Sequence, residues 1–174
     1  GDAAANTLNF ALVTLAGIAG ISGGGGNDSI TGSGGNDAMA GNAGDDALDG
    51  GAGDDAFLFT GAGDGFDSLA GGTGVDTAKA TTDGAVIGLR GVNGVEVFTA
   101  GGNADVSIRG SAAADGLDFS VATLVGIAGI GGGAGNDTIK GSAGDDTFTF
   151  TGAAEGYDAI TGNGGTDTLR ATAA

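Results

Sequence analysis

The chain has 174 residues, of which 42 are glycine and none is cysteine, histidine or proline, and its formal charge is −17. The missing histidine and cysteine exclude a zinc site and a His-based catalytic triad within this chain, and no apolar run approaches the roughly 20 residues of a membrane helix. The acidic charge disfavours nucleic acid and insertion into anionic membranes, and it favours small cations as partners.

Residues 1–79 are predicted to form a first block of turn-and-strand repeats. Four consecutive nine-residue units occupy 23–58, each with Gly at positions 1 and 4, Asp at position 6 and an apolar residue at position 8. Two more units follow a three-residue expansion, at 62–70 and 71–79, and 1–9 is a degenerate unit that keeps Leu8. Internal repetition of this kind is typical of solenoids.

Each unit divides into a turn and a short strand. Positions 1 to 6 carry Gly, Asn and Asp, which favour tight turns, whereas positions 7 to 9 alternate so that position 8 points inward. The predicted core therefore consists of the position-8 residues, which are Ile30, Met39, Leu48, Phe57, Leu69, Ala78, Ile139, Phe148, Ile160 and Leu169.

Residues 80–109 lack good Gly-Asp turns but keep strand signals about every ten residues, near Val86, Val95 and Val106. We expect further coils of the same solenoid here, without metal in most turns. A small separate β-domain is the alternative interpretation.

Residues 110–174 are predicted to form a second block, with units at 132–140, 141–149, 153–161 and 162–170 and a degenerate one at 110–118 that has Asp115 at position 6. The two halves are copies, because Phe10 matches Phe119 at an offset of 109 while Phe57 matches Phe148 at an offset of 91. The difference of 18 residues equals two units, which indicates that two nonapeptides form one coil. The prediction is an all-β parallel β-solenoid, one continuous rod.

Stacked coils would place the Asp of one turn over the Asp two units later. Such neighbouring carboxylates repel each other, and a dication would reverse the sign of this interaction. Only oxygen ligands are available in irregular turns, which favours calcium over magnesium, with about six ions at most. The alternative is that these Asp only cap turns. Asp45, Asp54 and Asp145, at position 5, are interpreted as solvated charges.

The units GGGGNDSIT, GGAGDDAFL and GGAGNDTIK resemble the RTX (repeats-in-toxin) family of haemolysin-type calcium-binding repeats, whose signature is GGxGxDxUx. The resemblance implies a right-handed parallel β-roll in which calcium binds the Asp of two stacked turns and backbone carbonyls of positions 1 to 4. The implied carboxylate ligands are Asp28, Asp37, Asp46, Asp55, Asp67, Asp76, Asp137, Asp146, Asp158 and Asp167. The candidate carbonyl ligands belong to Gly24, Gly26, Gly35, Gly41, Gly44, Gly50, Gly53, Gly74, Gly133, Gly135, Gly144 and Gly165.

The resemblance also implies an extracellular or bacterial cell-surface protein that leaves the cell by type I secretion and folds on external calcium. We expect a structural module of a larger surface-layer protein, adhesin or other secreted protein, with neighbouring coils or copies of itself as partners. The alternative is a calcium-folding accessory region of a secreted enzyme or toxin. Catalysis by this chain is not expected, because no nucleophile and base can be paired. Ice binding is disfavoured, since turn position 3 carries no ladder of Thr.

Overall fold

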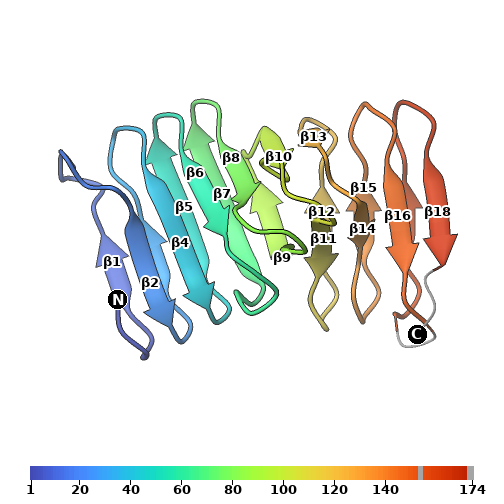
Figure 1. The fold of residues 1–174 in the computed structure, drawn as a ribbon, viewed down its shortest axis with the longest axis horizontal. Helices are drawn as coiled ribbons and strands as arrows, with labels where there is room; N and C mark the ends of the chain where they lie inside the picture. The colour runs from blue at the N-terminus through green and yellow to red at the C-terminus, as the bar shows by residue number, and fades with distance from the viewer. Residues whose placement is uncertain (153–154, 172–174) are drawn as a thin grey trace.

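The strands of the chain follow one another as the coils of a rod (Figure 1). The computed structural model describes residues 1–152 and 155–171, and every regular element within them is a β-strand. All strand pairs there are parallel. The predicted all-β solenoid is therefore confirmed. No described helix is long and apolar enough to cross a membrane.

One face of the rod, which we call face A, contributes a strand to every coil. Its strands are β1 (Thr7–Asn9), β3 (Ser29–Thr31), β5 (Ala47–Ala52), β7 (Asp67–Thr73), the second half of β9 (Val86–Asn93), β12 (Gly116–Asp118), β15 (Thr138–Lys140) and β17 (Ala159–Thr161). Their central residues are in register from Leu8 through Ile30 and Leu48 to Leu69.

The opposite side of the rod is built from two successive sets of strands. Face B consists of β2 (Ile21–Gly25), β4 (Ala38–Ala43), β6 (Ala56–Phe59), β8 (Thr77–Ala80), β10 (Val97–Thr99) and β13 (Thr123–Val125). Face C starts with the first half of β9 and continues through β11 (Ser107–Gly110), β14 (Gly129–Gly131), β16 (Thr147–Phe150) and β18 (Thr168–Ala171). The two faces overlap between β8 and β14, so the coils there have three strands.

The overlap shows whether residues 80–109 form coils of the solenoid or a separate β-domain. Ile87 pairs with Ile108 on face C while Phe98 pairs with Ala78 on face B, so these coils stack into the same rod. The rings of Phe98 and Phe119, both fully buried, meet edge to face at 5.0 Å. A separate β-domain is therefore the wrong interpretation. Aromatic side chains fill the core of the coils in which face B gives way to face C.

The predicted core positions are buried along most of the rod. All of them from Ile30 to Ala78 are at most 3% exposed, and so are Ile139 and Phe148. Ile160 is half-buried and Leu169 is 67% exposed, so the prediction was wrong for Leu169. Both lie in the last described coil, where a described neighbour packs on one side only.

Coil length varies without disturbing this register. Ile30 and Leu48 pair across a coil of 18 residues, and Leu48 and Leu69 pair across one of 21. The longer coil places its extra residues in the turn after β6, where the Asp64 carboxylate accepts hydrogen bonds from the Thr60 hydroxyl and backbone N–H. The Asp-containing turns, which lie along the edges of the rod, consequently stay stacked.

Candidate metal centre

The Asp at position 6 of each turn stacks on its equivalent in the next coil. The backbone N–H of one Asp donates to Oδ1 of the Asp that follows, at 2.7 to 3.1 Å. All six expected pairs have this bond, namely Asp28–Asp46, Asp37–Asp55, Asp46–Asp67, Asp55–Asp76, Asp137–Asp158 and Asp146–Asp167. The pairs spanning 21 residues stack in the same way as those spanning 18.

The second carboxylate oxygen of many of these Asp has no partner. Oδ2 is buried and receives no hydrogen bond in Asp28, Asp46, Asp55, Asp76 and Asp137. A buried polar atom that is left unsatisfied costs about 1–3 kcal/mol, and more when it is charged. A ligand with positive charge at these oxygens would remove that cost.

Glycine carbonyls surround the same oxygens because the turns leave no room for side chains. A Cβ added at Gly23 would contact Asp28 Oδ2 and lie 2.7 Å from the Gly41 carbonyl oxygen of the next coil. Gly44 has a φ of 132°, which L-residues rarely adopt, and a Cβ there would collide with the Gly26 carbonyl. A main-chain carbonyl of the next coil therefore lies close to Gly23, beside the Asp28 carboxylate.

The glycines whose carbonyl oxygens are predicted to bind calcium occupy three positions of these turns. Gly41 and Gly50 are at position 1, Gly24 and Gly133 at position 2, and the remainder at position 4, which are Gly26, Gly35, Gly44, Gly53, Gly74, Gly135, Gly144 and Gly165. Most of the position-4 glycines have positive φ, but Gly35 and Gly144 do not.

Burial makes the stacked carboxylates poor anions on their own. The pKa of Asp55 is raised to about 6 and that of Asp67 to about 8, chiefly by desolvation and to a smaller extent by neighbouring Asp side chains, against the opposing effect of the N–H bonds. The pKa values of Asp46, Asp76, Asp137 and Asp146 are also raised, first of all by burial. Burial in the metal-free turns thus makes ionisation of these Asp less favourable than in water.

The chemistry of this donor set fits a calcium ion. Within the described residues no group of three or more Asp, Glu, His or Cys side chains comes together to hold a metal. Each candidate site therefore rests on a carboxylate pair and main-chain carbonyls. Calcium takes about six to eight oxygen ligands in flexible geometry, including carbonyls, and it would supply charge that offsets the paired carboxylates.

Three turns have a different, closed form that the sequence analysis did not anticipate. The N–H of Ser33 donates to Asp37 Oδ2 at 2.6 Å, and Ser111 and Ser142 do the same to Asp115 and Asp146. Each of these serines occupies position 2. Most of the open turns have a residue of positive φ there, such as Gly24 (106°) or Asn42 (67°), a conformation that Ser rarely adopts.

Each closed turn holds the first Asp of a column of stacked Asp. Asp37, Asp115 and Asp146 receive no N–H from a preceding coil on Oδ1, whereas the Asp that follow them do. The local Ser N–H satisfies Oδ2 instead, so the pairs Asp37–Asp55 and Asp146–Asp167 have no buried unpartnered oxygen on their first member.

The Asp at position 5 are exposed at Asp54 and Asp145 and half-buried at Asp45, in line with solvated charges, but each also accepts a hydrogen bond from the next coil. Asp45 Oδ1 accepts the N–H of Phe66 at 3.1 Å, and its Oδ2 pairs with Arg90 at 3.0 Å. Asp54 and Asp145 accept N–H groups from Val75 and Thr166 in the same manner. These bonds run toward the following coil, opposite to those of position 6, so each turn is tied to both of its neighbours.

Two stacked pairs were missed from the sequence. Asp115 N–H donates to Asp137 Oδ1 at 2.8 Å, and Asp76 N–H donates to Glu96 Oε2 at 2.8 Å. Asp115 sits at position 6 of a degenerate unit, which was the available signal. Glu96 lies in a Val-Glu-Val segment without repeat spacing, so nothing in the pattern marked it.

Comparison with known proteins agrees with this geometry. The sequence model of the RTX calcium-binding nonapeptide repeat matches the chain in four copies, over residues 21–57, 61–80, 131–152 and 153–173, which is more than half of its length. A search of curated proteins found no match.

Proposed function

Since the chain belongs to the RTX calcium-binding nonapeptide repeat family, we propose that it is a calcium-folded structural module of a larger secreted bacterial protein, of the surface-layer or adhesin type. The residues that hold calcium in this proposal are the stacked Asp of the open turns together with the glycine carbonyls beside them. The module works outside the cell, where it folds when calcium enters the turns.

The unpartnered Oδ2 atoms carry this proposal. Five buried carboxylate oxygens without hydrogen-bond donors, at Asp28, Asp46, Asp55, Asp76 and Asp137, are difficult to explain in a metal-free native state. The thin core of the two-stranded coils offers limited compensation, because each of them buries only two or three large side chains, such as Met39 and Leu48. Calcium binding would add stability in proportion to the logarithm of its concentration.

The affinity of such sites for calcium and the charge of the chain support the extracellular location. Extracellular calcium modules bind with dissociation constants of about 10⁻⁴–10⁻³ M, so such sites stay empty at the low calcium of a cytosol and fill outside the cell. A chain of charge −17 without calcium repels itself, which suits passage through a secretion channel in unfolded form. The regular rod without a nucleophile–base pair suits a scaffold role rather than catalysis.

A calcium titration tests the proposal. We expect far-ultraviolet circular dichroism to show an unfolded chain in chelator and a cooperative gain of β-structure as calcium rises to the millimolar range, with magnesium far less effective. Equal β-content with and without calcium would contradict it.

A further inference from the structure

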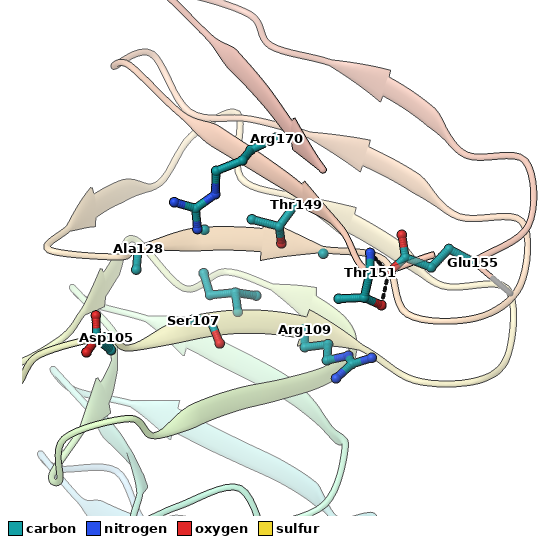
Figure 2. Close-up of a pocket in the computed structure, with 11 residues that line it drawn as sticks. Asp105, Ser107, Arg109, Ala128, Thr149, Thr151, Glu155 and Arg170 are labelled. Carbon is teal, nitrogen blue, oxygen red and sulfur yellow. Dashed lines mark hydrogen bonds between the residues drawn. The ribbon is translucent and has the colours of Figure 1, made fainter. Parts of the chain in front are cut away.

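Face C carries a hollow on its outer surface that the metal sites do not involve. It has a volume of about 250 Å³ and lies over β11, β14 and β16 (Figure 2). Its floor is formed by Gly129 and Gly131 of β14, which carry no side chains, and the methyl group of Thr149 covers part of Gly129. Thr149 of the next strand borders both glycines, with its Oγ1 3.3 Å from a Cβ added at Gly131.

Two arginines border this hollow, from strands on either side of the glycines. Register places Arg109 beside Gly131, and Thr149 beside Arg170, so the four residues form a row across β11, β14, β16 and β18. Three strand spacings of about 4.8 Å separate the ends of this row, or about 14 Å. A ligand lying across the strands could therefore meet a guanidinium at each end.

These arginines have no ion pair among the described residues, and the same holds for Lys79, which does not line this hollow. The chain has five basic residues, and the two ion pairs among the described residues use Arg90 and Lys140. Arg109 and Arg170 have no hydrogen bond or ion pair to any described residue. In a protein of charge −17, two unpaired guanidinium groups at one hollow indicate that an anionic group binds there.

The hollow also presents acceptors for hydroxyl groups. Glu155 is only 8% exposed; its Oε1 accepts from Thr151, and its Oε2 is buried without a partner. Asp105 and Ser107 line the hollow as well. In Figure 2 Glu155 and Thr151 lie at one end and Asp105 at the other. A simple inorganic anion would leave these acceptors unused and would be repelled by the carboxylates.

We propose that this hollow binds an acidic saccharide. Its acid groups, carboxylate or sulfate, pair with Arg109 and Arg170, and its hydroxyls donate to Asp105 and Ser107. Arginine presents a planar fork that matches such acid groups, and the glycine floor allows a sugar ring to lie close to the sheet. None of the stacked Asp lines the hollow, although Glu155 at its end is near enough to Asp137 to raise the pKa of that Asp, so the proposal goes beyond the proposed calcium-dependent folding.

The test uses the calcium-loaded chain at fixed excess calcium. Titration calorimetry or NMR would compare a galacturonic acid trimer, a sulfated disaccharide, a neutral trisaccharide and inorganic sulfate. We expect one or both acidic saccharides to bind, with the neutral sugar and free sulfate much weaker. The two acidic probes decide whether carboxylate or sulfate is preferred.

Three variants then locate the site. Arg109→Gln and Arg170→Gln should each weaken binding about tenfold, as expected for loss of a charged hydrogen-bonded contact, and Gly131→Val should block it by filling the floor. Arg90→Gln, which removes an arginine engaged elsewhere with Asp45, is the matched control and should bind as the parent does. Circular dichroism in calcium confirms that each variant has folded.

Three results would overturn the proposal. The first is equal binding of the neutral and acidic sugars, and the second is inorganic sulfate binding as tightly as the saccharides. The third is acidic saccharide binding that persists in the Arg109→Gln/Arg170→Gln double variant, because it would place the ligand on the bound calcium ions. Failure to fold in calcium would count against the proposed function instead, which keeps the two hypotheses distinguishable.

Discussion

The backbone N–H of Asp28 donates to Oδ1 of Asp46 in the next coil at 2.7 Å, while Oδ2 of both residues remains buried without a partner. The two oxygens of one carboxylate thus have different environments. Oδ1 ties the coils together and needs only an acceptor, which an amide could supply. Oδ2 needs a positively charged partner. An amide side chain could not replace it, because the amide carries no negative charge to bind a cation.

Replacing Asp46 by Asn separates these two roles. The Asn keeps an acceptor for Asp28 N–H but loses the charge at Oδ2, so we expect folding to require about tenfold more calcium and the number of bound ions to fall by up to two, since Asp46 belongs to two pairs. Calcium titration by circular dichroism and calorimetry measures both. One log unit corresponds to about 1.4 kcal/mol.

Asp45→Asn is the matched control in the same turn. It preserves the acceptor for Phe66 N–H and loses an exposed ion pair with Arg90, which is worth about 0–1 kcal/mol. The variant should need nearly the same calcium as the parent. Identical shifts in both variants would mean that Oδ2 of Asp46 does not contribute to a metal site.

The closed turn at Ser33 leads to a gain-of-binding prediction. Ser33→Gly removes the barrier to positive φ at position 2, so the turn can open, release Asp37 Oδ2 and admit an ion between the turns of Asp37 and Asp55. We expect about one additional calcium per chain by calorimetry. Ser33→Ala is the control: it deletes the hydroxyl but leaves the backbone restricted, and it should add no ion. An unchanged count in Ser33→Gly would refute this explanation of closed turns.

Much of this architecture could be predicted from the nonapeptide pattern, for a physical reason. Position-8 residues such as Ile30 and Phe57 recur at fixed positions of the repeat and therefore predict the buried face of each strand. Glycine at fixed turn positions predicts turns in which successive coils can stack closely. The change from face B to face C was not predictable, because residues 80–109 form strands without turn signals. Glu96 was missed because its role depends on which coil lies beside it, which local sequence does not state. The closed turn of Ser33 was missed although its local signal, Ser at position 2, stands in the repeat.

The raised pKa values predict how acidity acts on the metal-free chain. The pKa of Asp67 is about 8 in the folded chain against a reference of 3.8, and that of Asp55 is about 6. Such groups hold protons more tightly when folded, so the folded chain binds more protons than the unfolded one across this window. The stability of the metal-free fold therefore falls as pH rises from about 4 to about 8.

Thermal unfolding followed by circular dichroism checks this in calcium-free buffer between about pH 4.5 and 8.5. We expect β-structure to return at the acid end, and calcium affinity to rise with pH, because bound protons compete with the ion. Asp67→Asn should flatten the dependence between about pH 6 and 8, and measurements in high salt exclude general charge repulsion as the cause. A metal-free fold that gains stability with rising pH would contradict the assignment of raised pKa values.

The aromatic contact in the three-stranded coils predicts a defect that calcium cannot repair. Phe98→Ala leaves a cavity next to Phe119, with an expected loss of about 3–5 kcal/mol in the free energy of unfolding. Because a solenoid coil contacts only its neighbours, the two blocks should lose their coupling and melt in two transitions at saturating calcium. Val97→Ala, a smaller change at the adjacent, less buried position of β10, should retain one transition. Calorimetry reports both outcomes. Full recovery of Phe98→Ala by added calcium would show that the metal sites, rather than aromatic packing, join the two halves of the rod.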